Sequence, residues 1–519
     1  MNKMKKLVSL LLCVLLLCAA LPVFAEEEAD EIIYASDFAA GKDGWEGRSM
    51  GGVKLRNKED GSLYVTGRMG DWSGPAYPIT LPAGTLYWIS AEAMANQGAS
   101  VDFVLTVVYT KDGAEQSERI AQASGSNGAW VTLCGSWKSD DVQDVRICME
   151  TSDASTANFY IRNVVVQLND PRDVTEVTWE GELPVLKDVY AGHFDVGTCF
   201  SGYDAKNPAR CALVASQYNI ITPENELKPD SVLDVNASKR LVKETGDETA
   251  VAVHFDNAKP ILDFAKENGL KVHGHVLLWH NQTPEAFFHE GYEVGKPFVS
   301  REVMLARLDN YIRLVFEYMD ANYPGLFASW DVVNEAVADG STNLRESNWT
   351  KVVGQDFISR AFEIADKYAP EDVLLCYNDY STPYEPKLTG ICNLLEGLVA
   401  EGHIDGYGFQ THYSTGEPSV ATVKKAFDRI SALGLKLRVS EMDIKVDMDT
   451  DKNRAAQAQY YKDLFELYLT YDMEAVQVWG VCDSTSWIAA SYPLPFDANL
   501  NPKPAFFSIV EAVAPAGEE

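Results

Sequence analysis

The spacing of apolar residues changes once along the chain, near residue 170. Before that point, apolar and polar residues alternate in short runs, as at 62–66, 101–109, 129–133 and 158–166. Alternation with a period of two predicts half-buried β-strands, and Gly, Asn, Asp and Ser break the runs at short intervals. Residues 31–169 are therefore predicted to fold as an antiparallel, jelly-roll-like β-sandwich.

After about residue 184, short apolar segments alternate with longer amphipathic ones. Eight strands are predicted at residues 195–199, 219–222, 271–277, 328–333, 373–377, 406–410, 436–442 and 475–481. Helices are predicted at residues 208–217, 256–268, 300–321, 351–368, 384–400, 418–433, 451–471 and 503–513. Eight such units over residues 184–515 fit an α/β fold, the (β/α)₈ TIM barrel, whose strand ends converge on one mouth. Residues 170–183 are expected to form a linker between the two parts.

The first 25 residues differ from both parts. Three lysines precede an apolar run from Leu7 to Leu21, and Ala25 ends the segment. This is the pattern of a cleaved export signal, because about 15 apolar residues are too few to span a bilayer. We therefore expect residues 1–25 to be removed, and the mature chain to be secreted, extracellular and free of the membrane.

Composition narrows the possible partners. The chain has 44 Lys and Arg against 76 Asp and Glu, a net charge of −32. This charge argues against nucleic acid or an anionic membrane as a partner and is compatible with a neutral polymer. Seven cysteines follow the export signal, at positions 134, 148, 199, 211, 376, 392 and 482. They show neither a CxxC pair nor a Cys/His metal spacing, so no metal site is predicted.

Two of the predicted barrel strands end in a carboxylate. The run that starts at Trp330 closes the fourth strand with Asn334 and Glu335, and Glu441 closes the seventh. Strands four and seven face each other across an eight-stranded barrel, so both carboxylates are expected to flank one sugar bond. Either glutamate alone fits an ordinary exposed loop acid. Two of them, each after a buried strand, indicate hydrolysis of a glycosidic bond.

The expected chemistry gives each carboxylate a different role. Glu335 would protonate the leaving oxygen and then deprotonate water, whereas Glu441 would attack the anomeric carbon and form a covalent glycosyl-enzyme. This retaining mechanism needs the two carboxylates about 5–5.5 Å apart. Asn334 is predicted to bind the sugar 2-hydroxyl. His412, at the end of the sixth strand, would keep Glu441 charged while Asp443 orients the imidazole.

Two further polar segments, 222–229 and 274–282, follow the second and third strands. Three histidines within 273–280 raise the alternative of a metal site, but an acidic third ligand has no fixed spacing to them. Sugar recognition explains the mixture better, since hydroxyls need polar partners and ring faces need tryptophan. Trp479 and Trp487 are candidates to cover the sugar at the reaction centre, although Trp479 fits a core position almost as well.

Seven ordered motifs within residues 184–515 resemble glycoside hydrolase family 10, the endo-β-1,4-xylanases. They are Thr222-Pro223-Glu224-Asn225-x-x-Lys228-Pro229, Gly274-His275-x-x-x-Trp279-His280-x-Gln282, Trp330-Asp331-x-x-Asn334-Glu335, Asn378-Asp379-Tyr380, Gly408-x-Gln410-x-His412, Ser440-Glu441-x-Asp443 and Trp479-Gly480-x-x-Asp483-x-x-Ser486-Trp487. The resemblance implies a retaining enzyme acting on xylan without a cofactor. It makes Glu335 the acid/base and Glu441 the nucleophile.

The same resemblance implies two sugar-binding positions beside the cleavage point. The xylose two places away would be bound by Glu224, Asn225 and Lys228. The adjacent xylose would be bound by His275, Asn334, Gln410 and Trp487. Trp279 and Trp479 are further residues predicted to bind substrate.

The N-terminal part resembles a xylan-binding module of carbohydrate-binding family 22. The matching pieces are Asp37-Phe38, Gly44-Trp45-x-Gly47-Arg48, Gly67-Arg68-x-x-Asp71-Trp72-x-Gly74-Pro75, Val108-Tyr109 and Met149-Glu150-Thr151. By this likeness a cleft for xylan would be lined by Arg48, Trp72, Tyr109 and Glu150, although the aromatic residues also fit the sandwich core. Such modules often hold a structural calcium, but Arg162-Asn163 replaces the usual acidic pair, which argues against calcium here.

These features together predict an endo-1,4-β-xylanase whose partners are xylan and xylo-oligosaccharides. Two alternatives stay open. The same barrel would act on cellulose or mixed-linkage glucan if the pocket around Glu224, Lys228 and Trp487 admits a 6-hydroxymethyl group. A non-catalytic polysaccharide-binding protein with a decayed barrel is the other alternative, and the intact acid, nucleophile and supporting residues argue against it.

Overall fold

The chain divides into two compact units, Met1–Asp173 and Val174–Glu519, which are described separately here. The computed structural model describes residues 32–48, 52–96, 101–111, 113–125, 128–138, 142–152, 156–168, 174, 179, 181–446 and 449–513. The predicted export signal at 1–25 lies outside these residues, as does most of the predicted linker at 170–183. Among the described residues, none of the helices is long and apolar enough to cross a membrane.

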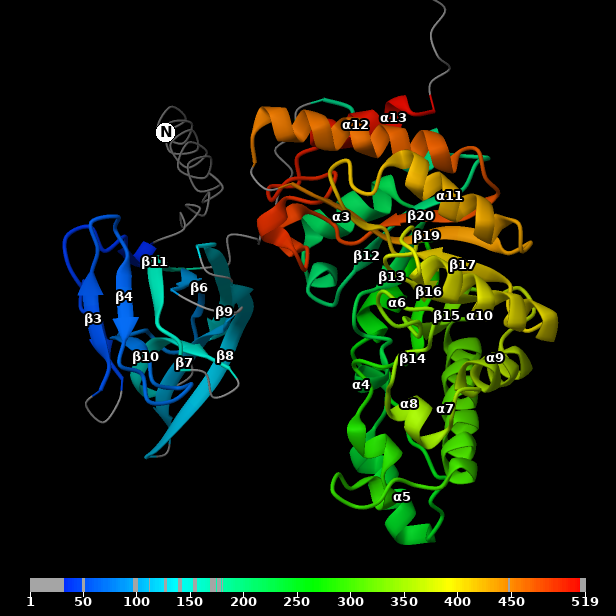
Figure 1. Cartoon of the computed structure of the whole chain (residues 1–519), viewed down its shortest axis with the longest axis horizontal. Coiled ribbons are helices and arrows are strands. Elements are labelled where there is room, and N and C mark those ends of the chain that lie inside the picture. The colour runs from blue at the N-terminus through cyan, green and yellow to red at the C-terminus, as the bar shows by residue number, and fades with distance from the viewer. Residues whose placement is uncertain are drawn as a thin grey trace, which may run out of the picture. The chain divides into compact units, whose positions relative to one another are not determined.

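The N-terminal unit is built from two antiparallel sheets (Figure 1). One sheet contains β1 (Ile32–Ser36), β3 (Lys54–Asn57), β4 (Leu63–Thr66), β6 (Leu86–Ala95), β9 (Val131–Lys138) and β11 (Phe159–Leu168). The other contains β2 (Glu46–Gly47), β5 (Pro75–Pro78), β7 (Val101–Lys111), β8 (Ala114–Gly125) and β10 (Gln143–Thr151). The predicted antiparallel sandwich is confirmed.

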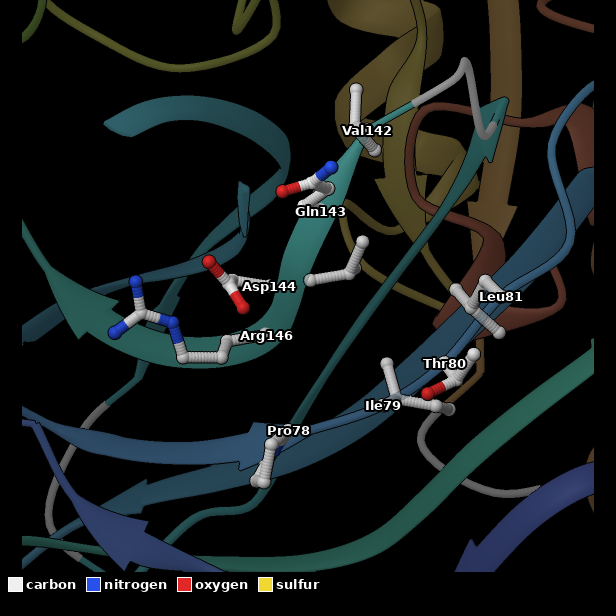
Figure 2. A pocket seen from close by; sticks show the side chains of 9 residues that line it. Pro78, Ile79, Thr80, Leu81, Val142, Gln143, Asp144 and Arg146 are labelled. Carbon is white, nitrogen blue, oxygen red and sulfur yellow. The ribbon is translucent and has the colours of Figure 1, made fainter. Parts of the chain in front are cut away.

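Alternate residues of each strand form the core between these sheets. Phe103, Leu105 and Val107 of β7 are fully buried and belong to the same apolar cluster as Ile147 and Phe159. The Phe103 and Phe159 rings meet edge to face with their centres 5.4 Å apart. A surface cavity of about 750 Å³ also lies in this unit, lined by residues 78–81 and 142–146 (Figure 2). The saccharide-binding residues predicted for this unit do not line that cavity.

The second unit is a closed barrel of eight parallel strands. These are β12 (Asp195–Phe200), β13 (Ile220–Pro223), β14 (Lys271–Trp279), β15 (Phe327–Asn334), β16 (Leu374–Asp379), β17 (Gly406–Phe409), β19 (Lys436–Lys445) and β20 (Met473–Val478). The ring closes because β20 pairs with β12 and β17 pairs with β19. An extra short strand, β18 (His412–Ser414), pairs with the end of β19. The predicted TIM barrel is confirmed.

Helices follow the strands in turn and surround them (Figure 1). They are α3 (Pro208–Gln217), α6 (Lys259–Asn268), α7 (Arg301–Asn322), α9 (Phe357–Tyr368), α10 (Lys387–Glu401), α11 (Val420–Ser431), α12 (Asp451–Tyr468) and α13 (Pro504–Glu511). The remaining helices are α2 (Leu186–Val189), α4 (Pro229–Val232), α5 (Val235–Thr245) and α8 (Asn348–Val352). The helix predicted at 351–368 is thus two helices, because Gly354 between them has a φ of 109°.

Polar side chains from five strands meet inside the barrel. His273 of β14 lies 2.8 Å from the hydroxyl of Ser329 on β15 and contacts Arg438 of β19. Gln477 of β20 accepts from Arg438 and donates to Thr222 of β13 at 2.9 Å. Buried polar groups are retained at low cost only where they are paired, and this network ties the strands together below the mouth.

Candidate active site

The carboxyl ends of the barrel strands surround a cleft of about 700 Å³. Glu335, which directly follows β15, and Glu441 of β19 both line it. All thirteen residues predicted for the barrel site except Asp443 line the same cleft, namely Glu224, Asn225, Lys228, His275, Trp279, Asn334, Glu335, Gln410, His412, Glu441, Trp479 and Trp487. Asp443 lies directly behind it, against His412.

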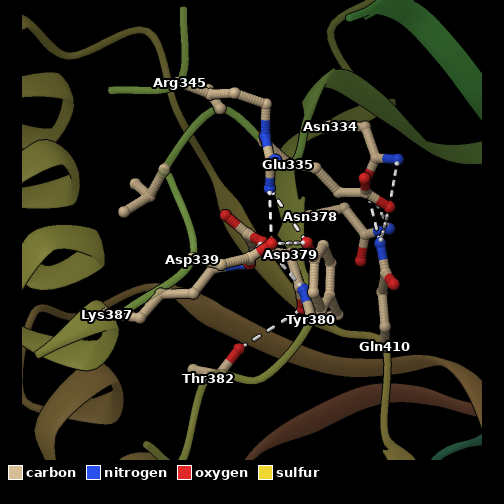
Figure 3. Close-up of polar contacts among 12 residues, drawn as sticks. Asn334, Glu335, Asp339, Arg345, Asn378, Asp379, Tyr380, Thr382, Lys387 and Gln410 are labelled. Carbon is tan, nitrogen blue, oxygen red and sulfur yellow. Dashed lines mark hydrogen bonds and ion pairs between the residues drawn. The ribbon is translucent and has the colours of Figure 1, made fainter. Parts of the chain in front are cut away.

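Neutral donors hold the carboxylate of Glu335. The indole N–H of Trp279 donates to its Oε2 at 2.9 Å, and the amide of Gln410 donates to its Oε1 at 2.9 Å. The Asn334 amide lies 3.3 Å from the same Oε1 (Figure 3). The backbone of Glu335 has a φ of 57°, so the chain turns sharply as it leaves the strand and directs this side chain into the cleft.

An amide and a histidine hold the carboxylate of Glu441. Its Oε1 accepts a 2.6 Å hydrogen bond from the Asn378 amide, and its Oε2 lies 3.3 Å from Nε2 of His412. Burial alone would raise the pKa of Glu441. The hydrogen bond from His412 and the nearby charges of His275 and His412 outweigh burial, so the pKa lies below its ordinary value.

His412 is part of a chain of contacts that ends at the rim of the cleft. Its Nδ1 lies 2.8 Å from Oδ2 of Asp443, and the exposed Trp487 donates its indole N–H to that same oxygen at 2.9 Å. Burial alone would lower the pKa of His412, but the carboxylates of Asp443 and Glu441 raise it to about 10. A protonated His412 therefore stabilises the charged form of Glu441.

Amide side chains join the two carboxylates. Asn378 of β16 donates to Oδ1 of Asn334 at 3.1 Å as well as to Glu441, and its own Oδ1 accepts from Ser440 at 2.7 Å. This reach from β16 to β19 crosses β17, where the intervening residue is Gly408. A Cβ added at Gly408 would lie only 2.3 Å from Oδ1 of Asn378. The absence of a side chain at this position therefore makes the contact possible.

One end of the cleft carries the polar residues predicted to bind a sugar. Lys228 donates to Oδ1 of Asn225 at 2.9 Å, and its ammonium lies 5.0 Å from the centre of the Trp279 ring. Burial, followed by the charge of Asp204, raises the pKa of Glu224 to about 7, while Lys228 opposes this shift. Hydroxyl partners and an aromatic face thus lie side by side, as a pyranose ring requires.

His275 and Trp479 lie on the floor of the cleft. Nδ1 of His275 is 2.9 Å from Oδ2 of the fully buried Asp331, which fixes the imidazole. The indole of Trp479 meets His275 edge to face at 5.6 Å and is 6% exposed. Trp479 is therefore both a packed residue and a cleft residue, whereas Trp487 is 57% exposed and free to cover a bound sugar.

In the N-terminal unit, three of the four predicted residues cluster on the outer face of one sheet. Arg48 forms an ion pair with Glu150, and its guanidinium lies 5.8 Å from the ring of Trp72, which is 44% exposed. Tyr109 is the exception. It belongs to the core-facing series of β7 and packs against Trp137 with ring centres 5.9 Å apart. The prediction that Tyr109 lines this cleft is therefore corrected, because strand alternation directs it to the opposite face.

At the position considered for calcium, an arginine side chain is paired with a glutamate. Arg162 lies 2.6 Å from Oε2 of Glu92, and Asn163 donates to its Oε1 at 2.9 Å. A carboxylate already engaged by a guanidinium does not fit a calcium ligand at this place. Among the described residues, His, Cys, Asp and Glu form no group of three or more that could hold a metal ion.

Comparison with protein families identifies both units. Residues 185–512 match the model of glycosyl hydrolase family 10. The chain belongs to that family. Residues 30–156 match the model of a carbohydrate binding domain, so the resemblances predicted from the sequence are confirmed for both units.

One solved structure of family 10 contains the same two kinds of module as this chain, and others match the barrel alone. The CBM22-1 and GH10 modules of endo-1,4-β-D-xylanase 10B from Clostridium thermocellum, complexed with xylohexaose, are 28% identical with a TM-score of 0.59. The match covers 93% of this chain and 98% of that one. The intracellular xylanase of Thermoanaerobacterium saccharolyticum, in a mutant complex with xylotriose, is 32% identical with a TM-score of 0.57. That match covers 64% of this chain and 99% of the other.

Two curated relatives of this family-10 chain are longer than it is. Endo-1,4-β-xylanase B of Butyrivibrio fibrisolvens is 36% identical over 339 residues, which cover 63% of this chain and 53% of the relative. Endo-1,4-β-xylanase A of Thermotoga maritima is 32% identical over 524 residues, which cover 95% of this chain and 48% of the relative. The chain spans about half the length of these relatives.

Six residues that line the family-10 cleft were not among the predicted site residues, namely His280, Asn281, Gln282, Arg345, Tyr380 and Lys445. Asn378 and Ser440, which do not line it, were not predicted either. Asn378 and Ser440 connect strands as described above. Arg345, in the loop after β15, lines the cleft and donates from Nε to the carbonyl of Glu335 at 3.3 Å. Sequence could have identified Asn378, since it lies at the end of β16 as Asn334 lies at the end of β15. Arg345 lies eleven residues beyond the end of β15, in a loop where sequence gives no rule of position.

Proposed function

We propose that this chain is a secreted, retaining endo-1,4-β-xylanase with an appended xylan-binding module. The main supporting observation is that one cleft holds two carboxylates in contrasting surroundings. The hydrogen-bond donors to Glu335 are all neutral, whereas Glu441 has a protonated imidazole beside it that favours its charged form. A glycosidase that works by double displacement needs this contrast.

In the first step, a carboxylate oxygen of Glu441 attacks the anomeric carbon as Glu335 gives its proton to the departing oxygen. The glycosidic bond breaks and an ester bond to Glu441 forms. In the second step, Glu335 takes a proton from water, the water oxygen bonds to the anomeric carbon, and the Glu441 carboxylate is released. His412 stays protonated throughout and lowers the energy of that leaving carboxylate.

The remaining cleft residues would bind and orient the chain of sugars. Glu224, Asn225 and Lys228 supply hydroxyl partners at one end of the cleft, and Asn334 lies close enough to the reaction centre to bind the 2-hydroxyl. Trp487 would cover the ring at the point of cleavage. In the N-terminal unit we assign xylan binding to Arg48, Trp72 and Glu150, and no longer to Tyr109.

Activity and stereochemistry can be tested together. The protein is incubated with xylan and, in parallel, with carboxymethylcellulose, and reducing sugar is measured. Proton NMR of the products in the first minutes then gives the anomer formed. Release from xylan with β-configured products supports the proposal, release from carboxymethylcellulose alone indicates a glucanase, and α-configured products contradict the retaining mechanism. Glu335→Ala and Glu441→Ala serve as inactive controls.

Secretion needs a separate test. The sequence pattern of residues 1–25 supports export, and the net charge of −32 suits a protein that works on an uncharged polymer outside the cell. Expression of the full chain in a secreting bacterial host, followed by N-terminal sequencing of protein from the medium, should give a chain that begins near residue 26. Intact chains that stay in the cell would contradict this part of the proposal.

A further inference from the structure

Lys387 is a buried cation that the cleavage chemistry described above does not use. It is the first residue of α10 and is 2% exposed. Its ammonium lies 2.8 Å from Oδ1 of Asp379 and 3.1 Å from Oδ1 of Asp339. A buried cation costs free energy unless it is well paired, and a helix N-terminus is the less favourable end for a positive charge. The fold therefore accepts two costs to place an ammonium here.

Asp379 contacts both Lys387 and Tyr377. It is fully buried at the end of β16, and its Oδ2 accepts a 2.5 Å hydrogen bond from the hydroxyl of Tyr377. Its Oδ1 contacts Lys387 and also accepts a 2.9 Å hydrogen bond from the backbone N–H of Tyr380. Both oxygens of the carboxylate are thus engaged, and the phenol of Tyr377 is fixed as a donor to Asp379.

Tyr377 in turn holds the backbone beside Glu335. Its hydroxyl oxygen accepts from the backbone N–H groups of Ala336 and Val337, at 2.9 and 3.2 Å. These are the two residues that follow Glu335, whose own backbone lies in the left-handed region at a φ of 57°. The chain of contacts from Lys387 therefore ends on the turn that directs the Glu335 side chain into the cleft.

A second route joins the same cation to the same turn (Figure 3). Asp339 accepts from the hydroxyl of Tyr380 at 2.5 Å as well as from Lys387. Arg345 donates to the Tyr380 hydroxyl at 2.9 Å and to the carbonyl of Glu335 at 3.3 Å. Both routes reach Glu335 through its backbone, and the hydrogen-bond partners found for Glu441 belong to neither.

We propose that Tyr377, Asp379 and Lys387 form a buried clamp that positions Glu335, and not Glu441, for proton transfer. This rests on the acid/base role given to Glu335 under the proposed function. The clamp residues do not line the cleft, so they are positioning residues that act through the turn at 335–337. A proton donor misplaced by a fraction of an ångström loses much of its effect, whereas an attacking carboxylate on another strand is untouched.

Substrates whose leaving groups differ in basicity distinguish a loss of proton donation by Glu335 from a loss of attack by Glu441. Departure of a sugar alkoxide needs the proton from Glu335, while departure of 2,4-dinitrophenolate does not. Tyr377→Phe removes only the hydroxyl that holds the two backbone amides. We expect its kcat/KM to fall about 10- to 100-fold on xylotetraose and to change little on 2,4-dinitrophenyl β-xylobioside. Since kcat/KM reports the steps up to the first bond cleavage, slow breakdown of the glycosyl-enzyme does not obscure this comparison.

The chain offers a matched control for a buried tyrosine. Tyr407 is also fully buried, and its hydroxyl lies 2.7 Å from Thr382 without a contact to the turn after Glu335. Tyr407→Phe should therefore leave the ratio of the two kcat/KM values unchanged. Lys387→Met should reproduce the leaving-group dependence of Tyr377→Phe, and Lys387→Arg should restore part of the loss because it keeps the charge.

The outcomes of this experiment are distinct. Equal losses on both substrates, or no loss on xylotetraose, would overturn the clamp. Asp379→Asn, which keeps the shape of the side chain, is measured alongside and judged by the same two criteria, so that poor folding of Tyr377→Phe would not prevent a decision. If Glu335→Ala keeps full activity on xylotetraose, the proposed function itself fails. If Glu335→Ala is impaired there and Tyr377→Phe is not, only the clamp fails.

Discussion

The ends of strands β15 and β19 present the same functional group in opposite surroundings. Glu335, after β15, receives hydrogen bonds from an indole and two carboxamides, all of them uncharged. Glu441, in β19, is fully enclosed beside His412, whose pKa is raised to about 10, and close to His275. The partners of Glu441 therefore include a cation, which favours its charged form, whereas the hydrogen-bond donors to Glu335 are all neutral.

This difference shows how one barrel mouth can run acid and nucleophile chemistry with two identical side chains. The strand scaffold brings both glutamates into one cleft, and the residues on adjacent strand ends then decide the behaviour of each. Four experiments would break or sharpen this comparison, and a fifth tests the N-terminal unit; they are ordered from the largest expected effect to the smallest.

Removal of the nucleophile should be the most damaging change. Glu441→Ala is expected to lower kcat/KM by about 10⁴-fold or more on every substrate, because the covalent route is lost. Glu335→Ala should lose about 10²- to 10⁴-fold on xylo-oligosaccharides and far less on 2,4-dinitrophenyl β-xylobioside. Steady-state kinetics on both substrates measures this. The same substrate dependence in both variants would show that the two glutamates do not differ in role.

Filling the space at residue 408 should disturb the link between the two carboxylates. In Gly408→Ala the new methyl would lie 2.3 Å from Oδ1 of Asn378 and 3.4 Å from the hydroxyl of Ser440. Asn378 must then move away from Glu441, and we expect kcat/KM to fall about 10- to 100-fold. Gly397→Ala on α10 is the control, because its methyl would meet nothing within 4 Å. Wild-type kinetics in Gly408→Ala would contradict the bridging role of Asn378.

Loss of the imidazolium should alter the pH dependence. His412→Gln removes a hydrogen bond and a charge that together lower the pKa of Glu441. A hydrogen bond to a charged group is worth about 1.5–3 kcal/mol, so kcat/KM at neutral pH should fall about 10- to 100-fold. The acidic limb of the pH profile should also move to higher pH. An unmoved limb would mean that His412 does not control the ionisation of Glu441.

The same histidine links stability to pH. The pKa of His412 rises from an ordinary 6.5 to about 10 on folding, so the folded state binds its proton more tightly. The resulting stabilisation is complete below pH 6.5 and is lost as the pH rises through about 10. Urea denaturation from pH 6 to 10 should therefore show the free energy of unfolding falling less steeply in His412→Gln than in the wild type. Identical slopes would argue against the raised pKa.

The smallest effect on catalysis is expected from the N-terminal unit. Trp72→Ala removes an aromatic face that is 44% exposed, and should weaken retention on insoluble xylan by about tenfold. Cleavage of xylotetraose should be unchanged. Tyr160→Ala, on β11 in the other sheet, is the control. Equal retention of wild type and Trp72→Ala would remove the binding role from this face.

Most of the fold could be predicted from sequence, because a strand buried on both faces is a continuous apolar run. All eight barrel strands appear where such runs occur, and their polar ends identify Glu335 and Glu441. The single helix predicted at 351–368 was wrong, because Gly354 has a φ of 109° and interrupts it. The amphipathic spacing of the sequence continues across this break and gave no sign of it. The extra strand β18 was also missed, because three residues carry too little pattern.

The site was less predictable wherever a side chain reaches beyond its neighbouring strand. Asn378 contacts Glu441 across β17, which depends on the empty space at Gly408 and not on any spacing in the sequence. Tyr109 was assigned to the wrong face of its strand. It lies near the end of β7 and continues the core-facing series of Phe103, Leu105 and Val107, so alternation along the strand gives its side once the core face is known.

The left-handed backbone at Glu335 has a consequence for engineering. With a φ of 57°, this position is one that glycine occupies freely and that alanine occupies at a cost of about 1 kcal/mol or more. Glycine usually destabilises a folded protein more than alanine does, but at this position the order is reversed. Glu335→Gly should therefore unfold at a higher temperature than Glu335→Ala. A glutamate stands where the backbone conformation would favour a residue without a side chain. The glycine variant is accordingly the sturdier choice for trapping an uncleaved oligosaccharide in crystals.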